Sequence, residues 1–179
     1  RVAQQGETGA QATLPRGLAL VVEYETLRIG ATDAVHLPRE RPWLSPDAEL
    51  ALNIPGQTPL EDGWVVTAQL LETWDMDAIV ANADALTAWL DADVVGATPV
   101  LRTRREGDRF APQGMAGRTV RLSDFLINVK LPQPRRDYLP LLVANEQLLW
   151  VVGERLSEAA LVRPHTRRVL RLHFDSLIC

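Results

Sequence analysis

Gly107-Asp108-Arg109-Phe110-Ala111-Pro112-Gln113-Gly114-Met115 is the stretch of this sequence that says most about its fold. Two glycines and a proline within nine residues predict a loop of defined shape, not a strand or a helix. Gly107 permits a positive φ, and we expect Asp108 to accept hydrogen bonds from loop amides or from a nearby arginine. The positions predicted to shape this loop are Gly107, Asp108, Pro112 and Gly114.

Basic side chains surround this loop, with nine arginines and lysines in the 35 residues from Arg102 to Arg136. An arginine fork binds two phosphate oxygens at once, which favours a nucleic-acid surface. Carboxylates are interleaved with these residues, so a solvated surface of mixed charge or a protein-binding surface stays open as an alternative. The residues predicted to contact nucleic acid are Arg104, Arg105, Arg109, Arg118, Arg121, Lys130, Arg135 and Arg136.

The net charge of −4 hides a difference between the two halves of the chain. Residues 1–92 carry 14 acidic and 5 basic side chains, which gives −9, whereas residues 93–179 carry 9 and 14, which gives +5. The basic half points to a polyanion partner, unless the two halves simply pack against each other. We predict a disordered leader over residues 1–13, an acidic strand-rich lobe over 14–92 and a basic lobe over 93–179, packed together as one unit.

Composition excludes several classes of protein. Hydrophobic residues make up 46% of the 179 residues and charged residues 23%, as in ordinary globular proteins. No apolar run approaches the roughly 20 residues that span a bilayer. The chain opens at Arg1 without a signal peptide and reads as a piece of a longer protein. The single cysteine, Cys179, permits no disulfide framework, which fits a reducing, cytoplasmic location.

Hydrophobic patterning predicts an α+β fold that is rich in strands and has few short helices. Proline makes residues 30–47 a loop, and turns are expected over 53–56 and 59–63. Ala-rich residues 77–90, capped by Asp77, predict a helix with an extended end over 88–90, and residues 122–130 predict a second helix that prolines stop. Strands are expected over 18–24, 26–29, 49–52, 64–71, 99–103, 138–143, 147–152 and 166–174.

Catalytic and metal-binding patterns are not found in this sequence. It has no glycine-rich phosphate loop, and none of its histidines is spaced for a metal site. Ser123 stands where a helix N-cap is expected, which we favour over a nucleophile. Trp64 and Trp150 are predicted core residues, and Trp43 is predicted to cover the edge of the core. The chain alone is therefore predicted to be inactive, with no catalytic, cofactor or metal residue.

An ordered series of short motifs resembles the C-terminal region of bacterial tRNA(Ile)-lysidine synthetase. The series begins with an arginine-rich strand and Gly-Asp-Arg-Phe, and it continues through a Pro-x-Gly-Met turn and a Leu-Ser-Asp-Phe helix. Each motif is common alone, whereas the ordered set is specific, and it covers roughly residues 88–174. The matching segments are 102–105, 107–110, 112–115, 122–125, 131–132, 136–137, 140–142 and 149–153.

The resemblance implies a function for the parent protein and a role for this part of it. Enzymes of that family use ATP and Mg²⁺ to join lysine to C2 of the wobble cytidine of tRNA(Ile). Their ATP-binding motif, Ser-Gly-Gly-x-Asp-Ser, is absent from this chain. The implied role is binding and positioning of tRNA(Ile), on a fold similar to a domain of the phenylalanyl-tRNA synthetase β subunit. The alternative is a structural or homodimerisation domain of the same enzyme without RNA contact.

Overall fold

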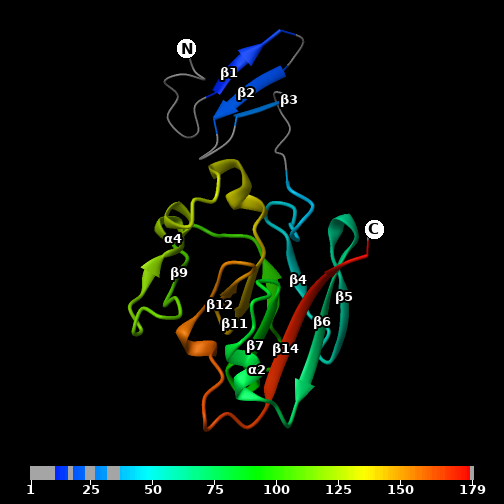
Figure 1. The fold of residues 1–179 in the computed structure, drawn as a ribbon, viewed down its shortest axis with the longest axis vertical. Coiled ribbons are helices and arrows are strands. Elements are labelled where there is room, and N and C mark those ends of the chain that lie inside the picture. Colours follow the sequence, from blue (N-terminus) through cyan, green and yellow to red (C-terminus); the bar gives the residue numbers. More distant parts are fainter. Residues whose placement is uncertain (1–10, 16–17, 23–26, 32–36, 178–179) are drawn as a thin grey trace.

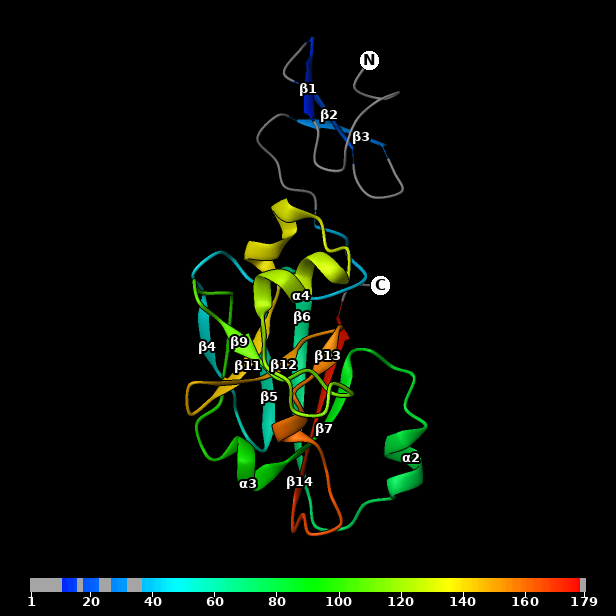
Figure 2. The same cartoon turned by 90° about the vertical axis from the view of Figure 1, so that its left-hand side faces the viewer.

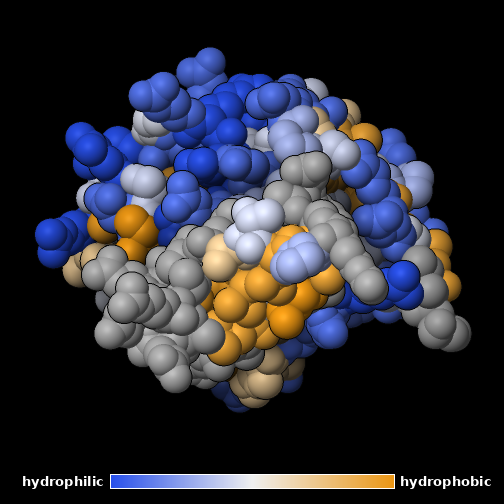
Figure 3. All heavy atoms as spheres, turned by 90° about the horizontal axis from the view of Figure 1, so that it is seen from above, coloured by the Kyte–Doolittle hydropathy of each residue, from blue (hydrophilic) through white to orange (hydrophobic). Residues whose placement is uncertain are grey.

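The computed structural model describes residues 11–15, 18–22, 27–31 and 37–177. The first three strands, β1 (Gln11–Leu14), β2 (Leu18–Val22) and β3 (Leu27–Ala31), form a separate antiparallel sheet. This sheet lies at one end of the molecule (Figures 1 and 2). Seen from that end, apolar side chains gather in one patch within a mostly hydrophilic surface (Figure 3). The large apolar side chains that this sheet exposes are Leu18, Leu27 and Ile29.

A five-stranded antiparallel sheet, called the central sheet below, runs through the middle of the main body. Its order is β13-β12-β11-β8-β4. Two of its strands, β11 and β12, form a hairpin around the turn at Asn145 and Glu146. The bounds of its strands are β4 Glu49–Ala51, β8 Val100–Arg102, β11 Leu141–Ala144, β12 Gln147–Val151 and β13 Arg155–Leu156.

A four-stranded antiparallel sheet, called the outer sheet, packs against one face of the central sheet. Its order is β5-β6-β14-β7, and β14 pairs with β6 along its whole length. Trp150 of the central sheet meets Phe174 of the outer sheet edge to face, with ring centroids 5.5 Å apart. The bounds of its strands are β5 Gly56–Pro59, β6 Trp64–Leu71, β7 Thr87–Asp91 and β14 Val169–Ser176.

The opposite face of the central sheet is covered by the helix α4 (Leu122–Asn128) and by a two-stranded ladder of β9 (Arg109–Phe110) and β10 (Val120–Arg121). Phe110 and Phe125 meet there edge to face at 5.1 Å. Every residue of β11 is therefore buried, because the sheet has a hydrophobic core on each side: the first core faces the outer sheet, and the second core faces α4 and contains Phe110 and Phe125. The other helical segments that the structure describes are α2 Met76–Val80, α3 Ala92–Val95, and the 3₁₀ turns η1 Glu61–Gly63, η2 Gln133–Tyr138 and η3 Glu158–Ala160.

The predicted helix over 77–90 is wrong for most of its length. Only α2 is helical, it is capped by Asp75 and not Asp77, and the predicted extended end is the strand β7. The side chain of Asn82 accepts the Asp84 amide, and Asp84 in turn accepts the Leu86 amide. These local bonds compete with helix formation, and pairing with β14 holds β7 extended.

Several shorter elements also differ from the prediction. The strand β5 joins the two predicted turns, where no strand was predicted, and α3 was not expected. The 107–115 stretch contains the strand β9, although it was predicted to hold no strand. The prolines after α4 begin the 3₁₀ turn η2, because proline is tolerated in a first turn. Ser123 is not the N-cap of α4, since β10 runs directly into this helix and Arg121 holds the cap position.

The remaining predicted elements agree with the structure in position, with shifts of a few residues at their ends. Strands β2, β3, β4, β6, β8, β12 and β14 lie in the predicted stretches, while β11 begins at Leu141 because Tyr138 ends η2. Trp64 and Trp150 are core residues, and Trp43 is 6% exposed and covers the second core. Residues 1–10 and 23–26 lie outside the described residues, and 11–13 belong to β1. Both large sheets take strands from each side of residue 92, so the two predicted lobes share their sheets, and the division itself stays a prediction.

Candidate nucleic-acid interface

A buried ion pair fixes the loop that leads into β9. Arg102, the last residue of β8, donates two hydrogen bonds to the Asp108 carboxylate, at 2.9 and 2.7 Å. The two side chains are only 7% and 13% exposed. The same carboxylate accepts the backbone amide of Arg105 at 2.7 Å. Both partners predicted for Asp108, a loop amide and a nearby arginine, are thus confirmed, and the loop is tied to the central sheet.

The electrostatics of Asp108 follow from these contacts. Burial raises the pKa of this carboxyl, but the hydrogen bonds from Arg102 and the Arg105 amide outweigh it, together with the charges of both arginines. The pKa of Asp108 is therefore lowered from its ordinary value. Gly107 has a φ of 86°, which confirms the predicted positive φ. The Asp108 carbonyl accepts the Leu122 amide at 2.9 Å, so the loop also holds the start of α4.

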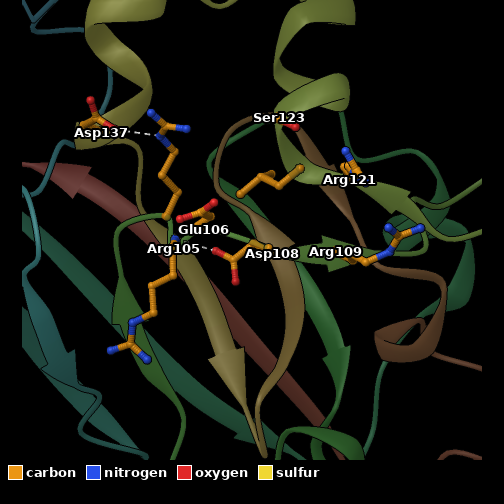
Figure 4. A pocket seen from close by; sticks show the side chains of 10 residues that line it. Arg105, Glu106, Asp108, Arg109, Arg121, Ser123 and Asp137 are labelled. Carbon is orange, nitrogen blue, oxygen red and sulfur yellow. Dashed lines mark hydrogen bonds and ion pairs between the residues drawn. The ribbon is translucent and has the colours of Figure 1, made fainter.

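A hollow of about 750 Å³, called the larger hollow, opens over this loop (Figure 4). Four arginines and three carboxylates line it. Arg104 pairs with Asp137 at 2.6 Å, and Arg105 pairs with Glu49 of β4 at 2.6 Å. Since Asp108 is held by Arg102, most of the charge in this hollow is already compensated within the chain. Its lining residues are Arg104, Arg105, Glu106, Gly107, Asp108, Arg109, Arg121, Leu122, Ser123 and Asp137.

A second hollow of about 500 Å³, called the smaller hollow, adjoins the first and shares Arg109 and Arg121 with it. Three arginines line the smaller hollow, and Asp124 is its one carboxylate. Within the part of the chain that the structure describes, none of these arginines forms an ion pair. The smaller hollow therefore carries more uncompensated positive charge than the larger one. Its lining residues are Arg109, Met115, Arg118, Thr119, Val120, Arg121, Asp124 and Asn128.

The other predicted contact residues lie outside both hollows. Lys130 is exposed just after α4, with a φ of 57°. Arg136 is partly buried and donates from Nε to the Leu131 carbonyl at 2.9 Å, and Arg135 also has an interaction partner. The eight predicted residues are thus divided: Arg109, Arg118 and Arg121 lie together, while Arg104, Arg105 and Arg136 have structural contacts.

The rest of the glycine-rich stretch is anchored to the central sheet by its backbone. Pro112 forms a bridge with Ser157, and the Gln113 amide donates to the Leu156 carbonyl at 2.8 Å. Gly114, with a φ of 86°, donates its amide to a Glu158 carboxylate oxygen at 3.3 Å. These bonds hold the loop that carries Met115 and Arg118 at the edge of the smaller hollow.

Sequence reasoning missed one residue and one pairing on which this geometry depends. Arg102 was counted with the basic cluster, but its side chain is buried beneath the loop. Arg109 and Arg121 face each other because β9 pairs with β10, and this pairing was not predicted. The sequence does contain a strand signal here, because the β-branched residues Thr119 and Val120 lie between Gly117 and an amphipathic helix.

The described residues contain neither a metal-binding cluster nor a membrane-spanning helix. Among residues 11–15, 18–22, 27–31 and 37–177, no three His, Cys, Asp or Glu side chains are grouped so that they could hold a metal ion. In the same ranges, no helix has the length and apolar character that crossing a membrane would need.

Known proteins resemble this chain in sequence and in structure. The family described as the TilS substrate C-terminal domain matches residues 100–174, which include both hollows. The tRNA(Ile)-lysidine synthase of Dehalococcoides mccartyi is 36% identical over 169 residues, which is 94% of this chain and 34% of that protein. The synthase of Clostridium tetani is 26% identical over 172 residues, 96% of this chain and 35% of that protein. The chain thus spans about a third of the length of these relatives.

A solved structure confirms the fold. The crystal structure entitled "Crystal structure of TILS C-terminal domain" has a TM-score of 0.62 and 25% sequence identity to this chain. The similarity covers 74% of this chain and 98% of the solved one. The resemblance that the motifs indicated and the strand-rich α+β fold are both confirmed.

Proposed function

Since this chain belongs to the family of the C-terminal domain of tRNA(Ile)-lysidine synthase, we propose that it binds the tRNA substrate of its parent enzyme and positions it for modification. The parent enzyme, acting in the cytoplasm, joins lysine to the wobble cytidine of tRNA(Ile) with ATP and Mg²⁺. In this proposal ATP and lysine bind elsewhere in the parent, and this domain contributes affinity and placement but no catalytic group.

The observation that carries the proposal is the group of three arginines around the smaller hollow. Arg109, Arg118 and Arg121 have no carboxylate partner among the described residues, and all three are exposed. Guanidinium groups that have no internal partner can neutralise RNA phosphates and so release the counterions condensed on the RNA. This release gives affinity without sequence preference. We place the primary RNA contact at this hollow, with exposed Lys130 beyond the end of α4 as a secondary contact.

The ion-paired arginines have a different part in the proposal. Arg104 and Arg105 would have to give up Asp137 and Glu49 before they could bind phosphate. Exposed pairs of this kind contribute only about 0–1 kcal/mol, so exchange is energetically accessible but brings little net gain. We infer that these two residues shape the larger hollow and contribute less to RNA affinity than the three free arginines.

The experiment is a titration of fluorescently labelled tRNA(Ile) with the 179-residue chain, followed by anisotropy across a salt series. The dissociation constant should rise steeply with salt, and the double variant Arg109→Glu with Arg118→Glu should weaken binding and flatten the dependence. Each lost phosphate contact lowers the slope of log K against log salt by about 0.9 on B-DNA and about 0.7 on single strands. For two lost contacts, a slope reduced by roughly 1.5–2 is therefore expected.

Arg167→Glu is the matched control, because Arg167 is an exposed arginine that lines neither hollow. It changes the net charge without touching the proposed surface, so its binding curve should stay close to that of the wild type. A loss per reversed charge that is equal in the control and in the double variant would show that only overall charge matters. If the double variant binds tRNA as the wild type does, the RNA-binding proposal is wrong, and the structural or dimerisation role takes its place.

A further inference from the structure

Arg109 and Arg121 face each other directly across the ladder of β9 and β10. Like charges at directly opposed positions of an antiparallel pair destabilise a sheet. The strands cannot move apart to relieve this repulsion. Phe110, next to Arg109, and Leu122, next to Arg121, are both buried in the second core, with exposures of 4% and 2%. Packing thus holds the two arginines at opposed positions, so that their side chains start from neighbouring points on the same face of the ladder.

Within the described part of the chain, no carboxylate forms an ion pair with either arginine, and this includes Glu106 of the larger hollow. Asp108 is next in sequence to Arg109, but its carboxylate is already bound by Arg102 and the Arg105 amide. Asp124 lines the smaller hollow, yet it forms no ion pair among the described residues and accepts a hydrogen bond only from the Ser123 hydroxyl, at 3.4 Å. Figure 4 shows Arg109 and Arg121 on the same side of the larger hollow, away from Asp108.

We propose that Arg109 and Arg121 form a clamp for one phosphate group, which binds between the two guanidinium forks where the two hollows join. This rests on the proposed function, in which the phosphate belongs to the RNA backbone. A phosphate placed there receives hydrogen bonds from two forks and removes the repulsion between them. The ligand class is a tetrahedral oxyanion, either free or as a phosphodiester.

The clamp has a signature that an ordinary contact residue lacks. Neutralising either arginine removes the repulsion in the free protein, so Arg109→Gln and Arg121→Gln should each raise the melting temperature in phosphate-free buffer of low ionic strength. An increase of about 1–3 °C is expected for a domain of this size. Arg118→Gln is the matched control. Arg118 also lines the smaller hollow, but no cation lies opposite it across a ladder, so the melting temperature of this variant should differ little from that of the wild type.

Inorganic phosphate is the probe for the ligand. At constant ionic strength, added phosphate should raise the melting temperature of the wild type and of Arg118→Gln, but not that of Arg109→Gln or Arg121→Gln. Arg121→Lys keeps the charge and loses the fork, so it should keep the low melting temperature and lose most of the phosphate response. With labelled tRNA, each clamp variant should bind about tenfold more weakly.

The outcomes separate the clamp from the proposed function. If melting temperatures and phosphate responses of Arg109→Gln and Arg121→Gln match the wild type while Arg118→Gln weakens tRNA binding, the clamp is overturned and RNA binding stands. If the phosphate response disappears in both clamp variants while tRNA fails to bind any form of the chain, the clamp is supported and the proposed function is overturned.

Discussion

Arg102 and Asp108 form a two-pronged ion pair, 2.7 and 2.9 Å long, beneath the loop that carries Arg109. Arg102 also donates to the Thr103 carbonyl at 2.8 Å, so its guanidinium is bound on two sides. The pair belongs to the protein's own architecture and is not available to a ligand. It lies one residue from Arg109, and it therefore connects the stability of the central sheet to the position of the basic surface.

Replacing Asp108 with alanine should destabilise the chain. The substitution leaves the buried guanidinium of Arg102 without its partner, and breaking such a pair costs about 3 kcal/mol. Asp108→Asn keeps one acceptor oxygen and should cost less. Urea unfolding measures both. Unchanged stability in Asp108→Ala together with lost tRNA binding would show instead that Asp108 contacts RNA.

Acidification should weaken the protein through the same carboxylate. The pKa of Asp108 is lowered on folding, since the hydrogen bonds and charges of Arg102 and Arg105 outweigh the effect of burial. Its contribution to stability is therefore complete above the unfolded pKa of about 3.9, and it is lost as the pH falls through the folded value. Unfolding midpoints of the wild type should thus fall more steeply below about pH 4 than those of Asp108→Asn.

The comparison with Asp108→Asn separates the pH effect of Asp108 from that of a second carboxylate, Asp84. Asp84 also has a lowered pKa, because hydrogen bonds from Thr87 and the Leu86 amide and the charge of His173 outweigh its burial. Asp84 is present in both proteins, so its contribution cancels in the difference. Parallel pH curves for the two proteins would contradict the predicted role of Asp108.

Gly153 should tolerate alanine less well than Gly107 does. Both have a positive φ, 77° and 86°, so both substitutions strain the backbone by about 1–2 kcal/mol. A Cβ at residue 153 would also lie 2.8 Å from Nη2 of Arg41, whereas one at residue 107 meets nothing within 4 Å. Arg41 cannot easily move away, because it bonds to Glu154 at 2.7 Å and to the Val152 carbonyl at 2.6 Å.

Urea unfolding of Gly153→Ala and Gly107→Ala measures this difference directly. The residue 153 variant should lose about 1 kcal/mol more than the residue 107 variant, which serves as the control for backbone strain. Equal losses would mean that the Arg41 side chain moves aside without cost.

Those parts of the fold that depend on apolar patterning could be predicted from the sequence. The hairpin of β11 and β12 and the long strands β6 and β14 follow from runs that bury one or both faces. The Ala-rich residues 77–90 misled the prediction, since local propensity favours a helix there while hydrogen bonds at Asn82 and pairing with β14 decide otherwise. The strands β9 and β10 are two residues long each, too short to show a period.

The residue types of the site could be predicted from the sequence, but which side chains pair with one another could not. A cluster of arginines is visible in the sequence, whereas the carboxylates that bind Arg104 and Arg105 lie 33 and 56 positions away. Which arginines remain free therefore depends on the tertiary fold. Whether Arg109 and Arg121 lie opposite each other also depends on the tertiary fold, because the register of β9 against β10 determines it.

Arg118 and Arg136 belong to the same basic run, and the structure predicts opposite effects for the same substitution at the two positions. Arg136→Gln removes the hydrogen bond from Nε to the Leu131 carbonyl and should lower stability by about 1 kcal/mol, with little change in tRNA affinity where the protein stays folded. Arg118→Gln removes an exposed side chain of the smaller hollow, so stability should stay within about 0.5 kcal/mol while tRNA affinity falls several-fold. Urea unfolding and anisotropy on both variants provide the comparison. If Arg136→Gln weakens tRNA binding as strongly as Arg118→Gln does, the basic residues act as one continuous surface, and internal hydrogen bonding does not decide which of them contact RNA.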